Sequence, residues 1–192
     1  MELAKIARVS ARGSFSLMVG TAASTVIGAI GVIVMARLLG PAGYGVYALT
    51  WVLPALFVSI ADFGVNPALT RYAASLRSQH RYERLASMIG SGLLFKLVAG
   101  SVGLLLVFGL STQLAGLVLQ RQEMGQLVAL ASIAILFQGI FSLSYGTFVG
   151  LDRMEQSAGI TVLRDSARAI LSPVLIVVGF GVAGAIAGQV LA

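Results

Sequence analysis

The sequence contains no cysteine and a single histidine, His80, and this composition excludes several kinds of site. Without cysteine the chain forms neither a disulfide framework nor a thiolate metal centre. One histidine does not make a metal-binding cluster. We therefore predict no metal site, and no other pattern in the chain points to a cofactor.

Charged residues are also scarce. They make up 10% of the 192 residues, whereas apolar residues make up 58%. Soluble domains are about 25% charged and about 45–50% apolar. A water-soluble fold has too little interior for that much apolar surface, but lipid solvates the apolar outer faces of a helix bundle directly. The chain is therefore predicted to be a membrane protein.

The motifs of soluble enzymes are incomplete in this sequence. Asp62-Phe63-Gly64 matches a kinase tripeptide, but the glycine-rich loop and the His-Arg-Asp loop of kinases are missing. Gly179–Gly184, GFGVAG, has the spacing of a dinucleotide fingerprint without the acidic residue expected about 20 positions later. The sequence has no Walker A motif, no Ser-His-Asp set and no paired carboxylates. We predict no catalytic residues and a protein that is not an enzyme.

Long apolar runs predict an all-α, polytopic membrane bundle. Ser14–Leu39 alone forms roughly 39 Å of helix at 1.5 Å per residue, enough for a bilayer core of about 30 Å. GPAGYG at Gly40–Gly45 predicts a turn before the chain returns. Three more runs predict spans at 46–60, 86–110 and 126–149. The last run is Ala169–Ala192. Its hydropathy fits either one span or the ends of two spans that meet at Gly179–Gly181.

The basic residues predict an orientation. Ten of the thirteen precede the first span, lie between the second and third, or follow the fourth: Lys5, Arg8, Arg12, Arg71, Arg77, Arg81, Arg84, Arg153, Arg164 and Arg168. The positive-inside rule then places the N-terminus in the cytoplasm. Because topology already explains the net charge of +6, no nucleic-acid partner is predicted.

Two patterns describe helix faces. Tyr44, Tyr47 and Trp51 recur at spacings of three and four, which predicts one aromatic face near the outer membrane interface. Small residues also recur, and such rows allow close helix packing. They are Gly20, Ser24 and Gly28 in the first span and Gly92, Gly100 and Gly103 in the third.

Ionisable residues inside the spans are candidates for function because charge in a membrane is costly. Lys96 lies near the middle of its run, so it needs a cavity or a buried partner such as Asp62, in a transport role or a structural ion pair. Asp62 lies inside the bilayer if one helix runs from Tyr44 to Ala74; otherwise it lies at the interface or pairs with Arg71. Polar stripes with helical spacing accompany these charges: Ser59, Asp62, Asn66 and Thr70, then Gln138, Ser142 and Tyr145.

The positions of Arg164 and Arg168 depend on where the fifth span begins. These two residues share a helix face because they are four positions apart. If the span begins near Gly159, they lie about 7–14 Å deep in the inner leaflet. If it begins at Ala169, they are cytoplasmic anchors.

Several segments together resemble the polysaccharide and oligosaccharide flippases of the multidrug, oligosaccharidyl-lipid and polysaccharide (MOP) exporter superfamily. They are ARLLGPAGYGVYAL, IADFGVNPALTRYAA, FVGLDRMEQSAGI and VGFGVAGAIAG. The resemblance implies ATP-independent, ion-coupled transport of polyprenyl-pyrophosphate-linked sugars by alternating access between two six-helix lobes. Residues 1–192 then form one transmembrane domain, the N-terminal lobe, cut short in its sixth helix. The expected partners are membrane lipid, the lipid-linked sugar and a second six-helix lobe, in the cytoplasmic membrane.

The resemblance also implies roles for the polar residues of the spans. Arg164 and Arg168 then lie within the fifth helix and face a central cavity, because the GFG segment joins the fifth and sixth helices. With Lys96 they are the expected pyrophosphate partners, and Asp62 is the expected coupling or gating carboxylate. The predicted substrate path is completed by Asn66, Gln138 and Ser142.

Two other functions remain as alternatives. A cation-coupled multidrug exporter of the same superfamily would use Asp62 as a proton site and prefer cationic substrates. A membrane scaffold without transport activity, or a gene fragment, would need no substrate path. Within the leading hypothesis a peptidoglycan precursor is less favoured, since Thr21, Ser24, Thr25 and Gly28 stand where flippases of that precursor carry arginines in the first helix.

Overall fold

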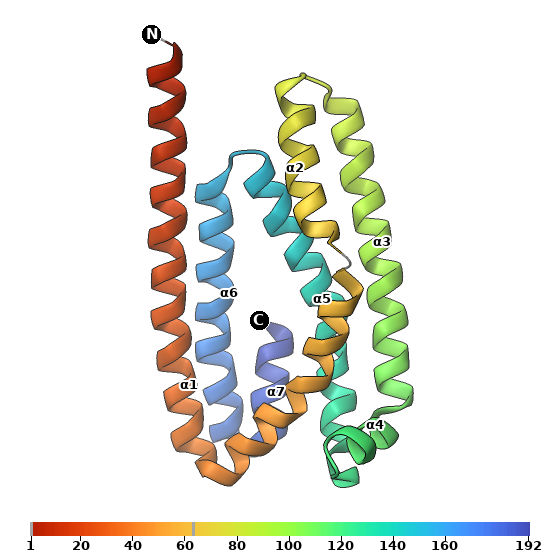
Figure 1. The fold of residues 1–192 in the computed structure, drawn as a ribbon. Coiled ribbons are helices and arrows are strands. Elements are labelled where there is room, and N and C mark those ends of the chain that lie inside the picture. The colour runs from red at the N-terminus through yellow and green to blue at the C-terminus, as the bar shows by residue number, and fades with distance from the viewer. Residues whose placement is uncertain (1, 63) are drawn as a thin grey trace.

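The computed structural model describes residues 2–62 and 64–192, with side chains from residue 13 onward. These residues form a helix bundle, which confirms the predicted all-α membrane fold (Figure 1). The side chains of Lys5, Arg8 and Arg12, on which the predicted orientation partly rests, lie outside the described ones. The helices are α1 (Glu2–Asp62), α2 (Val65–Ser78), α3 (Tyr82–Gly109), α4 (Ser111–Val118), α5 (Gly125–Gly150), α6 (Met154–Leu175) and α7 (Gly181–Leu191).

Helix α1 folds back on itself at Gly40. This residue has φ 68° and ψ 173°, a conformation that only glycine adopts without strain. Helix resumes at Pro41, whose fixed φ and missing N–H suit a first helical position. Figure 1 shows the two halves as the red and orange arms of α1. The turn predicted over Gly40–Gly45 is therefore wrong in length, because one glycine reverses the chain.

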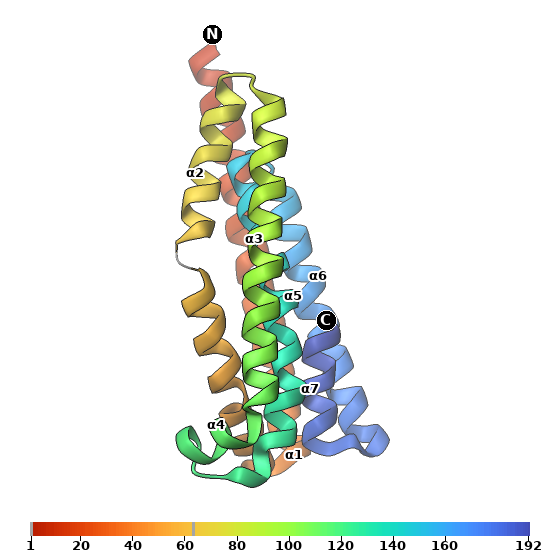
Figure 2. The same cartoon turned by 90° about the vertical axis from the view of Figure 1, so that its right-hand side faces the viewer.

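The second break lies between α1 and α2. Asp62 is the last residue of α1, and Gly64 has φ 75° before α2 begins at Val65. Figure 2 shows α2 continuing roughly in the direction of the second arm of α1. Of the two alternatives that the sequence left open, one uninterrupted helix from Tyr44 to Ala74 is therefore excluded, because a left-handed glycine interrupts the helical hydrogen bonds.

The last apolar stretch forms two helices. A π-helical turn over Ile176–Phe180 follows α6, and Gly179 has φ 110°. Gly181, with φ 53°, then begins α7, which runs back along α6 (Figure 1). The structure thus decides the question that hydropathy left open, and it places Arg164 and Arg168 within α6.

Four stretches are long and apolar enough to span a membrane: Gly13–Asp62, Tyr82–Gly109, Gln122–Gly150 and Met154–Leu191. The first stretch reverses at Gly40 and the last at Gly179, so each of these two stretches contains two helical segments that run in opposite directions. Large apolar side chains on their outer faces are exposed, as lipid-facing residues are, among them Ile30, Leu94 and Leu105. The chain is a multi-pass membrane protein.

Small residues let α1 and α6 approach closely. A Cβ atom on Gly20 would lie 2.5 Å from the Cβ of Ala158, and one on Gly31 would lie 3.0 Å from that of Ala169. Gly100 likewise faces α5, whereas Gly28 has open space around it. The predicted small-residue packing is therefore present at Gly20 and Gly100 but absent at Gly28.

Candidate functional site

A cavity of about 480 Å³ lies between the second arm of α1 and helices α5, α6 and α7. Small-molecule sites in proteins typically occupy about 300–1,000 Å³. Aromatic and small apolar residues from α1 form one wall, and Arg164 and Arg168 from α6 lie on the wall too. Gln138 of α5 and Gln189 of α7 add two side-chain amides. The cavity is thus apolar over much of its lining, with basic and amide groups at a few points.

The aromatic wall consists of the three residues predicted to share a face. Tyr44 and Tyr47 have ring centroids 5.8 Å apart, and Tyr47 and Trp51 meet edge to face at 6.4 Å. They lie in the part of α1 that follows Gly40, but Tyr47 is only 3% exposed and all three line the cavity. The predicted shared face is confirmed, and helices α5 and α7 pack against it. Its position near the outer membrane interface stays a prediction.

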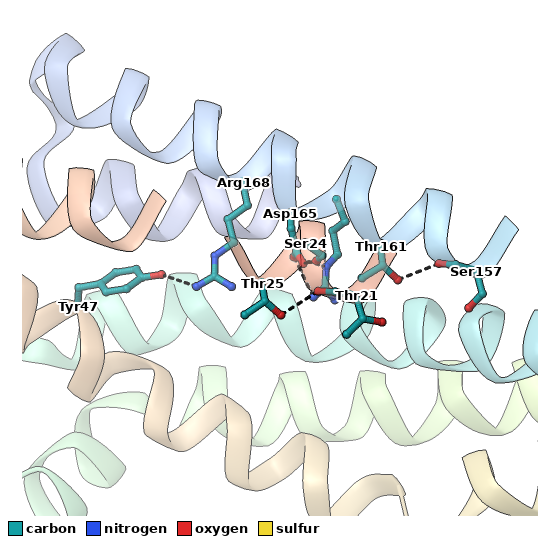
Figure 3. A network of polar contacts seen from close by, with 9 residues as sticks. Thr21, Ser24, Thr25, Tyr47, Ser157, Thr161, Asp165 and Arg168 are labelled. Atoms are coloured by element: carbon teal, nitrogen blue, oxygen red, sulfur yellow. Dashed lines mark hydrogen bonds and ion pairs between the residues drawn. The ribbon is translucent and has the colours of Figure 1, made fainter. Parts of the chain in front are cut away.

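Arg164 is paired with a neighbouring carboxylate. Its Nε and Nη2 atoms donate to Oδ1 of Asp165 at 3.3 and 3.2 Å, and its guanidinium lies 4.1 Å from the centre of the Phe141 ring. The other carboxylate oxygen, Oδ2, accepts a hydrogen bond from Ser24 of α1. Figure 3 shows Ser24 and Asp165 pointing toward each other. Asp165 therefore links α6 to α1 while it neutralises Arg164.

Arg168 has a different set of partners. Its Nη2 atom donates to the hydroxyl oxygen of Tyr47 at 3.3 Å (Figure 3). The Tyr47 hydroxyl in turn donates to Oε1 of Gln189 on α7. Three helices thus meet at Arg168 through neutral side chains.

Lys96 and Asp62 form an ion pair, which is one of the arrangements that the sequence left open. Nζ of Lys96 donates to Oδ1 of Asp62, so the partner of Asp62 is Lys96 and not Arg71. The Lys96 side chain is 5% exposed and that of Asp62 is 28% exposed. Neither residue lines the large cavity. Lys96 instead lies beside a void of about 10 Å³, with Gly100 and Gly139.

The remaining predicted path residues are dispersed. Gln138 lines the cavity, and Ser142 donates to the backbone oxygen of Gly139 at 2.9 Å. Asn66 lies on α2, where its buried Oδ1 has no hydrogen-bond partner among the described residues. The stripe predicted from Ser59 to Thr70 is not one helix face, because the break at Gly64 shifts the residues that follow it.

Sequence reasoning missed Asp165, Tyr47 and Gln189 as members of the polar network. An acidic residue next to Arg164 within an apolar stretch was a usable signal, because intramembrane acids need partners. Tyr47 and Gln189 carried no such signal, since their contact depends on how α1 and α7 meet.

Comparison with known proteins identifies the family of this chain through a family model. The model of the polysaccharide biosynthesis protein family matches residues 10–192. Among curated proteins, the lipid II flippase MurJ of Bacillus subtilis (strain 168) is 25% identical over 167 residues. That match covers 83% of this chain and 31% of the flippase, so the chain spans about a third of its relative's length.

Two solved structures share the fold. One is an outward-facing multidrug resistance MATE family transporter of the MOP superfamily, with a TM-score of 0.66 and 20% identity. The other is a MOP superfamily transporter from Pyrococcus furiosus, described as having a binding pocket of reverse polarity, with a TM-score of 0.65 and 20% identity. Each match covers 95% of this chain and 41% of the other. The chain belongs to the polysaccharide biosynthesis protein family, and its fold matches about two fifths of each of these two transporters.

Proposed function

We propose that the chain is the N-terminal lobe of a flippase that moves polyprenyl-pyrophosphate-linked oligosaccharides across the cytoplasmic membrane. Transport is by ATP-independent alternating access, and a second six-helix lobe completes the pathway. The observation that carries the proposal is the cavity, whose wall combines basic side chains on α6 with aromatic rings on α1. A pyrophosphate in a low-dielectric core needs positive partners, and guanidinium groups bind phosphate oxygens well.

The family and the relatives support this substrate class. The matching family is described by polysaccharide biosynthesis, and the curated relative is named as a lipid II flippase. Both descriptions fit a substrate that joins a lipid, an anionic linker and a sugar. The aromatic wall offers flat apolar faces to such a sugar.

A cation-coupled multidrug exporter is the second candidate, because a MATE family transporter shares the fold. The charge of the cavity argues against it. Arg164 and Arg168 line the wall, and no Asp or Glu is among the described lining residues. A positive wall repels the amphipathic cations that such exporters carry.

Orientation follows from the two ends of the bundle. The α2–α3 and α5–α6 turns lie at one end, and the fold at Gly40 and helix α4 lie at the other (Figure 1). Arg77, Arg81 and Arg153 lie at the first end, whereas Arg121 lies at the second. We propose that the first end, together with the N-terminus, is cytoplasmic.

Asp62 and Lys96 are proposed to act in coupling or gating. Their ion pair lies at the break between α1 and α2, where a change in helix direction alters the distance between them. In this role they lie off the cavity wall and bind no pyrophosphate at rest.

Complementation in cells tests the proposal. A bacterial strain that lacks its own exporter of a lipid-linked polysaccharide repeat unit is supplied with the full-length protein. Restored surface polysaccharide supports the flippase. Resistance to cationic drugs without restored polysaccharide would instead indicate the drug exporter, and neither effect in a strain with verified membrane insertion would indicate a scaffold.

A further inference from the structure

The two arginines of the cavity wall differ in their electrostatic surroundings. Arg164 donates twice to Asp165, at 3.3 and 3.2 Å, so a carboxylate cancels its charge at contact distance. Arg168 forms no ion pair with any described residue, and its hydrogen-bond partner is the neutral hydroxyl of Tyr47. Asp165 itself does not line the cavity. The net positive charge of this wall therefore belongs to Arg168.

The free hydrogen-bond donors show the same difference. A guanidinium has five N–H donors. Arg164 directs two of them to Asp165, and Phe141 covers a face of the group. Arg168 uses one donor on Tyr47, which leaves four. Arg168 thus keeps the donors that a bidentate contact with a phosphoryl group requires.

Tyr47 holds the Arg168 guanidinium in place. Its hydroxyl accepts from Arg168 at 3.3 Å and donates to Gln189 of α7, so its proton and one lone pair are both used. The Tyr47 side chain is buried and packs against Trp51. Tyr47 is accordingly a positioning residue that fixes Arg168 without neutralising it.

We propose that Arg168 alone binds the phosphoryl oxyanion of the ligand, whereas Arg164, Asp165 and Ser24 form a neutral clamp between α6 and α1. The proposal rests on the proposed function and deepens it, because it assigns the anion to one residue. A model in which both arginines grip the anion makes different predictions. In that model Asp165 orients the guanidinium of Arg164, which binds the anion together with Arg168.

Binding of farnesyl pyrophosphate to the protein in lipid nanodiscs separates the two models. Trp51 is the only tryptophan in the sequence and lines the cavity, so its fluorescence reports binding. Arg168→Gln is expected to weaken binding by about tenfold or more, as loss of a charged hydrogen-bonding partner does. The double variant R164Q/D165N removes the neutral clamp with both of its charges and is expected to weaken binding much less than R168Q does. Asp165→Asn alone removes the carboxylate that neutralises Arg164, so farnesyl pyrophosphate is expected to bind more tightly.

Several results overturn this assignment. Equal loss in R168Q and R164Q/D165N overturns it, and so does weaker binding in D165N. Arg168→Lys is a control for misfolding in R168Q. Lysine keeps the positive charge but lacks the planar guanidinium, so we expect binding of intermediate strength. If R168K binds as tightly as the unsubstituted protein, the bidentate contact is contradicted. Inorganic pyrophosphate and farnesol distinguish an anion site from a lipid site, and farnesol binding as tightly as its pyrophosphate contradicts the assignment. Failure of the unsubstituted protein to bind either pyrophosphate contradicts the proposed function itself.

Discussion

Lys96 in the middle of α3 donates a hydrogen bond to Asp62, the last residue of α1 before the chain breaks. The ammonium group is almost fully buried, and Asp62 is about a quarter exposed. Removal of one member of a buried pair leaves the other without compensation, which is costly in a membrane interior. The pair therefore links the stability of the bundle to the conformation of the break.

Lys96→Ala tests what the pair does. We expect the variant to insert into the membrane, to unfold at a lower temperature and to lose export. The double variant K96A/D62N removes both charges and is expected to recover much of the stability, with a coupling free energy of about 0.5–3 kcal/mol. Melting of the purified proteins and polysaccharide export in cells measure the two effects. Full export by K96A at normal abundance would show that neither the pair nor Lys96 takes part in transport.

Gly20 and Gly28 offer a matched test of helix packing within α1. Gly20→Ala places a Cβ 2.5 Å from that of Ala158, whereas the same change at Gly28 meets nothing within 4 Å. We expect G20A to destabilise the protein by about 1–3 kcal/mol through overpacking. G28A is expected to be neutral or slightly stabilising, because alanine favours helix over glycine. Equal melting temperatures for the two variants would contradict the contact between α1 and α6.

Tyr47→Phe tests the positioning of Arg168. The change keeps the ring in the aromatic wall but removes the hydroxyl that contacts both Arg168 and Gln189. We expect weaker binding of farnesyl pyrophosphate, by about threefold to tenfold. Ring packing and melting temperature should change little. Unchanged affinity in this variant would mean that Arg168 needs no support from α1.

The absence of cysteine makes topology directly testable. Gln79→Cys lies in the α2–α3 turn and Glu123→Cys in the turn that precedes α5, and both native residues are exposed. An impermeant thiol reagent added to intact cells should label the second variant and spare the first. The opposite labelling pattern would reverse the proposed orientation.

The sequence predicted the parts of this fold that depend on composition and local conformation. Apolar runs located the spans, and the glycines at 40, 179 and 181 lie where the helices reverse. The pairing of Lys96 with Asp62 was also predictable, because a buried ammonium needs an anionic partner.

The parts that sequence did not predict depend on packing. Gly64 was not recognised as a helix break, since glycine also occurs within helices of membrane proteins. The contact of Asp165 with Ser24 requires α6 to lie against the first arm of α1, at a separation of 141 residues. No pattern within a single helix carries that information.

The most direct test of the account is flipping in proteoliposomes. A polyprenyl-pyrophosphate-linked oligosaccharide with a fluorescent sugar is placed in both leaflets, and dithionite destroys the dye in the outer leaflet. The full-length protein should let the inner-leaflet dye become accessible, and R168Q should reduce that rate by about tenfold or more. A rate no faster than in protein-free liposomes, or an R168Q rate equal to that of the unsubstituted protein, would contradict the account.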